Sequence, residues 1–208
     1  MTRPAWLMLG VVVLLGAWFG PLPALARESF SAHMTMHMTV VAVVAPLIAA
    51  GVSGTRFDPA RAWPWLVAPV HASIVELIVV WTWHAPALHH LARQERWGLL
   101  LEQASFLGVA LWLWIAAAGG AQNRRARRGA GIFALLLTSM HMTLLGALLA
   151  LATRPLYQHD DVGALSPLAD QQLGGAIMLL VGSSAYLAGG LLLTAGLLDR
   201  STRQEPCV

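Results

Sequence analysis

The chain has 208 residues, of which 57% are hydrophobic and only 11% are charged, and its formal net charge is +3. A water-soluble domain carries about a quarter charged residues, so this composition excludes a soluble globule and indicates an integral membrane protein. The positive charge lies in short connectors between apolar segments, which is typical of membrane topology and argues against a nucleic-acid partner. The single cysteine, Cys207, excludes a disulfide framework and any paired-cysteine metal motif.

A transmembrane helix needs about 20 apolar residues to cross the hydrocarbon core, and six runs in this chain approach or exceed that length. The sequence therefore predicts an all-α fold, a polytopic bundle of six transmembrane helices that forms one domain over residues 1–208. The predicted spans lie near residues 5–25, 32–51, 64–84, 97–119, 131–153 and 171–198.

The first of these runs has two interpretations. Arg3, a long apolar stretch and the small residues of Ala24-Leu25-Ala26 together resemble a secretory signal peptide with its cleavage site. Removal of this segment would leave five spans. The length of the run favours a retained first helix, and in both cases the chain after residue 26 starts outside the cytoplasm.

The arginines predict the orientation of the bundle. The densest positive cluster, NRRARR at 123–128, is expected on the cytoplasmic side. Counting spans from this cluster places the C-terminus in the cytoplasm and the connectors at 27–32, 85–96 and 154–170 outside. For a bacterial chain this means a multi-pass protein of the inner membrane, with those connectors in the periplasm. Arg93 and Arg96 count against this orientation.

The second run begins with HMTMHM, an unusual concentration of imidazole and thioether groups. At about 100° per residue, His33, Met36 and His37 share one face of a helix. Imidazole and thioether ligands suit Cu(I), and ionisable groups inside a membrane are usually functional. For the methionines, packing of an irregular core is the default interpretation.

The third run, HASIVELIVVWTWHAP, contributes Glu76 within apolar sequence and His84 near its end. An intramembrane carboxylate is costly unless it is neutral or paired. Glu76 is therefore expected either to orient a ligating imidazole or to hydrogen-bond between helices. His84 is a further candidate ligand. Pro86 is expected to end the helix, leaving His89 and His90 as exposed loop residues.

The last two spans add fewer candidates. Met140-His141-Met142 places His141 near the middle of the fifth span, as a metal ligand or as a partner in an interhelical hydrogen bond. Asp170 is expected to cap the N-terminus of the sixth span. Gly174 and Gly175 predict close packing against a neighbouring helix.

Several of these motifs resemble those of the membrane-integral CtaG family of cytochrome c oxidase assembly factors. The resemblance runs from about residue 30 to residue 190, through the segments HMTMHMTVVAVVAPLIAAG, WTWHAPALHH, LEQASFLGVALWLW, SMHMTLLGALLALATRPLY and SPLADQQLGGAIM. It implies a helical bundle that helps to assemble haem–copper oxidase, with histidine and acidic positions at His33, His37, Glu76, His84, His141 and Asp170. One departure stands out, because the family often has a Glu-His pair where this chain has Glu102-Gln103.

The leading hypothesis is a non-enzymatic assembly factor, a copper chaperone that binds Cu(I) transiently through His33, Met36, His37, His84 and His141, with Glu76 close by. Its expected partners are cytochrome c oxidase subunits and a copper donor protein. No phosphate-binding loop, GxSxG or HExxH motif indicates hydrolase or transferase chemistry. Three alternatives remain open: a haem-binding protein with histidine axial ligands, a copper permease, and a metal-free scaffold.

Overall fold

The computed structural model describes residues 2–63, 65, 67–119, 124–157 and 165–202, with the backbone alone for 124, 125 and 199–202. These residues form helices and no strand, which confirms the all-α prediction. Cys207 and the residues from 158 to 164 lie outside the described part. The helices, including two short π-helical segments labelled η, are α1 (Arg3–Phe19), α2 (Leu22–Glu28), α3 (Phe30–Met38), η1 (Thr39–Val44), α4 (Ala45–Val52), α5 (Pro59–Ala62), α6 (Pro69–Trp83), α7 (Pro86–Gln94), α8 (Arg96–Ala118), α9 (Arg124–Ala150), α10 (Pro167–Ile177), η2 (Met178–Gly182) and α11 (Ser183–Thr202).

Four helices of the described chain are long and apolar enough to cross a membrane, namely Phe30–Val52, Arg96–Ala118, Ala126–Ala150 and Pro167–Leu198. The protein is therefore a helical membrane protein. The first predicted span is broken, because α1 and α2 meet at an angle of 46° and qualify only as a bent pair. The third is shortened to the 15 residues of α6. Six spans thus remain a prediction, with two of the six differing from the expected continuous helix.

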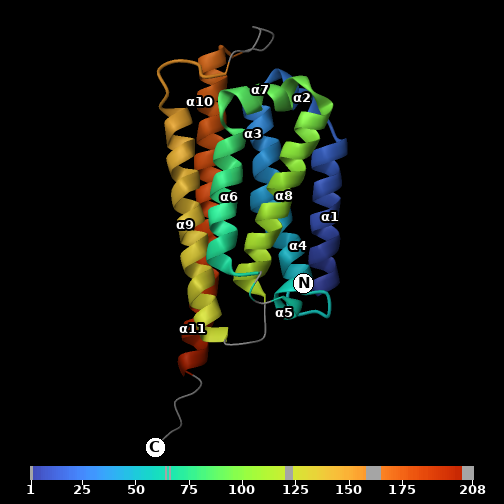
Figure 1. Ribbon diagram of the computed structural model, residues 1–208, viewed down its shortest axis with the longest axis vertical. Helices are drawn as coiled ribbons and strands as arrows, with labels where there is room; N and C mark the ends of the chain where they lie inside the picture. Colours follow the sequence, from blue (N-terminus) through green and yellow to red (C-terminus); the bar gives the residue numbers. More distant parts are fainter. Residues whose placement is uncertain (1, 64, 66, 120–123, 158–164, 203–208) are drawn as a thin grey trace, which may run out of the picture.

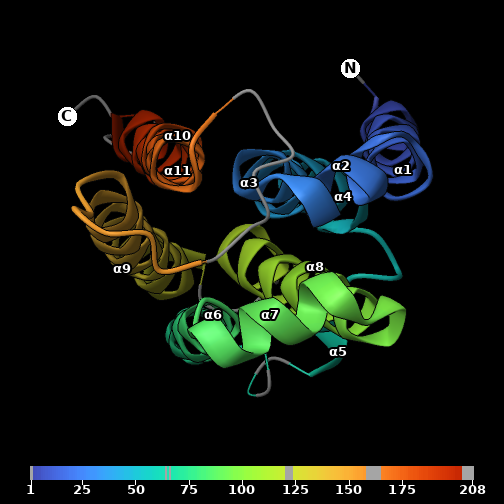
Figure 2. The ribbon, with the colours of Figure 1, turned by 90° about the horizontal axis from the view of Figure 1, so that it is seen from above.

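The helices form an antiparallel bundle in which successive long elements run in alternate directions (Figure 1). Helix α6 packs between α8 and α9, α9 packs along α11, and α10 joins α9 to α3. The short helices α2 and α7 lie across one end of the bundle, while α5 lies at the opposite end (Figures 1 and 2). We refer to the end that carries α2 and α7 as the α7 end.

The helix of the second span widens to the π form over Thr39–Val44, just before Pro46. In π geometry the carbonyl of Val41 would accept from the residue five positions later, which is Pro46 and has no N–H. The indole Nε1 of Trp114 on α8 donates to this carbonyl instead, at 3.2 Å. A side chain from another helix thereby satisfies a backbone group that proline leaves without a donor.

Glycines let α10 approach two neighbours closely, as the sequence predicts. A Cβ atom at Gly174 would lie 2.3 Å from Cδ1 of Phe30 on α3, and one at Gly175 would lie 2.4 Å from the backbone nitrogen of Ala150 on α9. Both distances are well below van der Waals contact. The pair of glycines therefore fixes how closely α10 can pack on both helices, and this packing positions the site described next.

Candidate metal centre

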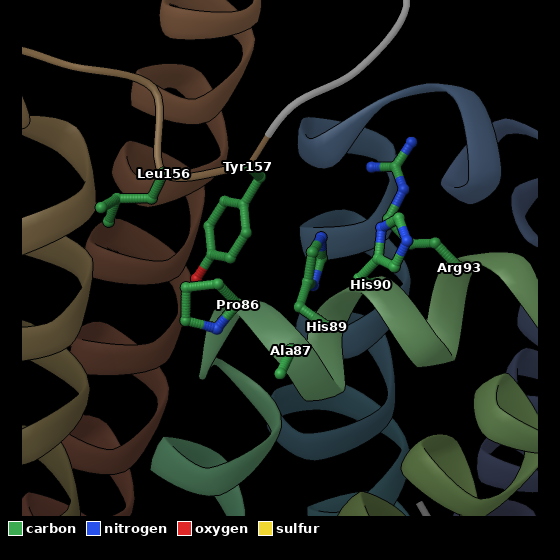
Figure 3. A pocket seen from close by; sticks show the side chains of 7 residues that line it. All are labelled: Pro86, Ala87, His89, His90, Arg93, Leu156 and Tyr157. Carbon is green, nitrogen blue, oxygen red and sulfur yellow. The ribbon is translucent and has the colours of Figure 1, made fainter.

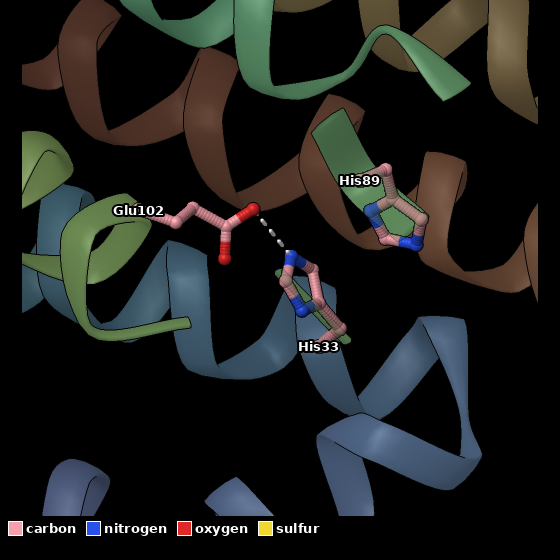
Figure 4. Close-up of side chains that lie close together, drawn as sticks. All are labelled: His33, His89 and Glu102. Carbon is pink, nitrogen blue, oxygen red and sulfur yellow. Dashed lines mark ion pairs between the residues drawn. The ribbon is translucent and has the colours of Figure 1, made fainter. Parts of the chain in front are cut away.

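Three buried side chains from three helices converge at the α7 end: His33 of α3, His89 of α7 and Glu102 of α8 (Figure 4). One potential ligand atom of each lies within 4.8 Å of those of the other two. Nε2 of His33 is 3.2 Å from Oε1 of Glu102. None of the three is more than 2% exposed. We call this group the ligand cluster, because two imidazoles and one carboxylate at this spacing can hold a metal ion.

The beginning of α3, and with it His33, is held by Asp170 of α10. The Asp170 carboxylate accepts hydrogen bonds from the backbone N–H groups of Phe30 at 2.5 Å and Ser31 at 3.1 Å. The hydroxyls of Ser29 and Ser31 donate to the same carboxylate. A negative charge that satisfies free N–H groups at a helix N-terminus is favourable.

The expectation that Asp170 caps its own helix is wrong. The N-cap of α10 is Ser166, whose hydroxyl accepts from the backbone N–H of Ala169. Asp170 lies in the first turn of α10 and turns its carboxylate to α3. The sequence pattern correctly identified Asp170 as a capping carboxylate but assigned it to α10. The helix that it caps is α3, which lies about 140 residues earlier in the chain and cannot be found from local sequence.

His89 is not the exposed loop residue that the sequence predicts. Pro86 begins a new helix, α7, and the spacing of three residues between His89 and Ala92 turns both inward. The His89 ring packs against the rings of Tyr157, Phe30 and His33, with centroids 4.3, 5.3 and 4.9 Å away. His90, the next residue, is exposed as predicted.

Tyr157 supports the cluster from the chain segment after α9. Its ring stacks on Phe30 with centroids 4.6 Å apart, and its hydroxyl donates to the carbonyl of His84 at 2.7 Å. Burial, together with the negative charge of Glu102, raises the pKa of the Tyr157 phenol above its usual value. The phenol therefore stays a neutral hydrogen-bond donor.

The segment that carries Tyr157 is tied down by the two residues after Asp170. The side-chain oxygen of Gln171 accepts from the backbone N–H of Leu156 at 2.6 Å, and Gln172 donates to the carbonyl of Ala152 at 3.0 Å. Each of the three polar residues of the motif DQQLGG therefore makes a hydrogen bond to another segment of the chain. The motif holds the start of α3 and the segment after α9 around the cluster.

His37 and His84 form a second histidine group one helical turn deeper, and we call them the inner pair. Their ring centroids are 5.7 Å apart. His37 is fully buried against Phe106, and neither of its ring nitrogens has a hydrogen-bond partner in the described part of the chain. Nδ1 of His84 bonds the Val80 carbonyl at 2.7 Å, whereas its buried Nε2 has no partner.

Glu76 lies elsewhere, between α6, α9 and α11. It accepts hydrogen bonds from the Tyr186 hydroxyl at 2.5 Å and the Thr138 hydroxyl at 3.3 Å. Ser73 and Thr138 share a further bond at 2.8 Å. Among the described contacts Glu76 meets no histidine, so this carboxylate has the interhelical role that the sequence left open as the alternative.

The structure does not bring the two remaining predicted ligands into these groups. Met36 lines a separate pocket of about 270 Å³ between α1, α2, α3 and α8. His141 is 5% exposed, and no described hydrogen bond, ion pair or ring contact joins it to another histidine. The interhelical hydrogen bond predicted for His141 is likewise not among the described contacts.

The sequence-based prediction missed Glu102 and His89. A signal for Glu102 was present, since a carboxylate in an apolar helix is as unusual at 102 as it is at 76. Gln103, the residue after Glu102, donates from its amide Nε2 to Oε2 of Glu102 at 3.3 Å. For His89, the signal was the amphipathic pattern of the segment after Pro86.

A pocket of about 370 Å³ opens beside the cluster, and we call it the outer pocket (Figure 3). Arg93 lines this pocket, and its guanidinium donates to the carbonyl of Arg27. Burial lowers the pKa of Arg93 to about 10, while the negative charge of Asp170 acts to raise it. His89 borders both the pocket and the cluster. His89 is thus the one member of the ligand cluster that lines the outer pocket. The lining residues are Pro86, Ala87, His89, His90, Arg93, Leu156 and Tyr157.

Fold and site together define a helical membrane protein with a buried group of possible metal ligands at one end. Residues 1–200 match the family described as cytochrome c oxidase caa3 assembly factor (Caa3_CtaG). The chain belongs to this family, as the sequence motifs predict. Comparison with curated proteins gave no match. Comparison with solved structures gave none either.

Proposed function

We propose that this chain assists the assembly of cytochrome c oxidase by holding a copper ion transiently at the ligand cluster of His33, His89 and Glu102. The observation that supports this most directly is the convergence of three buried ligand atoms within 4.8 Å from three separate helices. Membership in the assembly-factor family supplies the client, the oxidase. Copper is the cargo, received from a donor protein and passed to an oxidase subunit.

The charge of the cluster favours Cu(I). Two neutral imidazoles and one carboxylate give a ligand set with a charge of −1, so a bound Cu(I) leaves the buried site neutral. A divalent ion would leave one uncompensated positive charge in a low-dielectric region, which is costly. The soft thioether that the sequence predicts as a ligand, Met36, is not required for this argument.

Release of the ion is favoured by the outer pocket. It provides an opening of about 370 Å³ at the side of His89, so a client can approach without the bundle unfolding. The predicted orientation places this opening outside the cytoplasm, at the outer face of a bacterial inner membrane, with the C-terminus inside. An ion held by three ligands keeps a position for an incoming ligand from the client.

The test is the Cu(I) affinity of purified protein measured against a chromogenic chelator. We expect His33→Ala, His89→Ala and Glu102→Gln each to weaken binding at least tenfold, since even outer-shell changes at metal sites cost about 10- to 100-fold. The matched control is His71→Ala, which removes an exposed histidine of α6 that does not line the outer pocket. It should bind copper as the unmodified protein does.

Oxidase assembly in cells gives the second readout. The three cluster variants should accumulate less copper-loaded oxidase, while the His71→Ala strain should not. Equal copper affinity in all four variants would contradict the proposal. Full oxidase assembly by the cluster variants would favour the scaffold interpretation, and a Soret band in the purified protein would favour haem binding.

A further inference from the structure

The inner pair has buried ring nitrogens that no described residue satisfies. Both nitrogens of His37 and Nε2 of His84 are without a hydrogen-bond partner, at side chains that are 0% and 7% exposed. Leaving a buried polar group without a hydrogen-bond partner destabilises a folded protein. Such groups in a native fold call for an explanation, and an ion or ordered water is a common one.

From this arrangement we infer that His37 and His84 form a second copper site, deeper in the bundle than the ligand cluster. The choice of copper as the bound ion rests on the proposed function. The bond from Nδ1 of His84 to the Val80 carbonyl fixes the tautomer, because a carbonyl accepts and Nδ1 must then carry the proton. Nε2 is therefore a lone-pair donor to a metal.

The spacing of the two rings suits one shared ion. Metal–imidazole bonds are about 2 Å long, so two imidazoles on opposite sides of one ion hold their ring centroids about 6 Å apart. The centroids of His37 and His84 are 5.7 Å apart, at an interplanar angle of 63°. Two neutral nitrogen ligands leave one positive charge on a bound Cu(I) and two on a divalent ion, so the singly charged ion is the less costly occupant of this buried site.

The two sites follow one another along α3. His33 and His37 are four residues apart and lie on the same side of the helix. The outer pocket is lined by His89 and not by His37 or His84, so an ion that enters there meets the cluster first. The charge of Glu102 also acts on His84, but its oxygen contacts His33 of the cluster. The inner pair has no carboxylate ligand of its own, so we expect it to bind more weakly and to fill after the cluster.

The experiment is a Cu(I) titration of the purified full chain to saturation, with the number of bound ions per chain as the readout. We expect two ions for the unmodified protein and one for His37→Ala and for His84→Ala. In both variants the tighter site should keep its affinity within about twofold, because the cluster is intact. His71→Ala, which removes an exposed histidine of α6, should keep two ions.

The possible outcomes separate this inference from the proposed function. One ion in the unmodified protein, lost with His33→Ala and kept with His37→Ala and His84→Ala, overturns the second site and leaves the first. Unchanged copper binding in the cluster variants overturns the proposed function instead. If His37→Ala does not purify as a monodisperse protein, His37→Gln keeps a polar side chain of similar size and should also bind one ion.

Discussion

Asp170 determines the position of a ligand on another helix without touching the cluster itself. Its two carboxylate oxygens accept from two backbone N–H groups and two serine hydroxyls at the start of α3. The side-chain amide of an asparagine at this position would keep one acceptor oxygen, but its NH₂ group would face the N–H and O–H donors of α3. We expect Asp170→Asn to lower the free energy of unfolding by about 1–3 kcal/mol and to weaken copper binding several-fold. Thermal unfolding in detergent and a copper titration measure the two effects.

Asp58 provides the matched control for this prediction. It is a buried capping aspartate at the opposite end of the bundle, where its carboxylate accepts from the N–H groups of Ala60 and Gly54. Asp58→Asn should lower stability by a similar amount and leave copper affinity unchanged. A similar loss of copper affinity in both variants would mean that Asp170 acts through general stability and not through α3.

At the level of residues, the sequence indicated the chemistry better than the grouping. Histidines at 33, 37 and 84 were found because ionisable side chains in apolar helices are unusual. Their division into a ligand cluster and an inner pair depends on how α3, α6, α7 and α8 pack against one another. The spacing of residues along a single helix does not predict this packing. Met36 shows the limit clearly, since helical periodicity places it near His33 while the structure turns it to another pocket.

At the level of helices, the apolar runs predicted where the long elements lie and failed at their interruptions. The run at 64–84 becomes a helix only from Pro69, a residue suited to the first turn because it has no N–H to satisfy. The run at 5–25 breaks near Gly20 and Pro21 into α1 and α2. The π segment before Pro46 depends on a donor from Trp114, a contact between distant parts of the chain.

The packing of α10 on α9 can be tested at Gly175. A Cβ atom there would lie 2.4 Å from the backbone nitrogen of Ala150, and backbone atoms cannot rotate away as a side chain can. We expect Gly175→Ala to force the helices apart and to cost about 1–3 kcal/mol of stability. The measurement is the thermal unfolding midpoint of the purified protein.

Gly190→Ala is the control for that change, because it adds the same methyl group on α11, where the nearest atom is Cδ2 of Leu136 at 3.6 Å. This is ordinary van der Waals contact. Alanine is also a better helix former than glycine by about 1 kcal/mol, so this variant should be as stable as the unmodified protein or slightly more so. Equal destabilisation by both substitutions would show that close packing is not the cause.

At the level of the whole molecule, the two ends of the bundle differ in chemistry. The ligand cluster, the inner pair and the outer pocket are built mainly from α3, the end of α6, α7 and the start of α8, toward the α7 end. Helix α5 and the start of α9 lie toward the other end (Figure 1). Positively charged connectors favour the cytoplasmic side of a membrane. Arg27, Arg93, Arg96 and Arg154 nevertheless belong to the α7 end, so arginines are found at both ends of the bundle. The predicted orientation rests on the denser arginine cluster at the start of α9, and it can be tested directly.

The orientation can be measured by labelling single cysteines in a Cys207→Ser background, which removes the chain's one native thiol. Ala87→Cys places a thiol on the exposed side of α7, and Phe57→Cys places one on a side chain that is 69% exposed at the opposite end. In intact spheroplasts a membrane-impermeant maleimide should label the first at once and the second only after permeabilisation. Both positions are exposed in the folded protein, so a difference in labelling reports the membrane and not burial. The reverse pattern would place the ligand cluster on the cytoplasmic side, and copper would then have to be received from inside the cell.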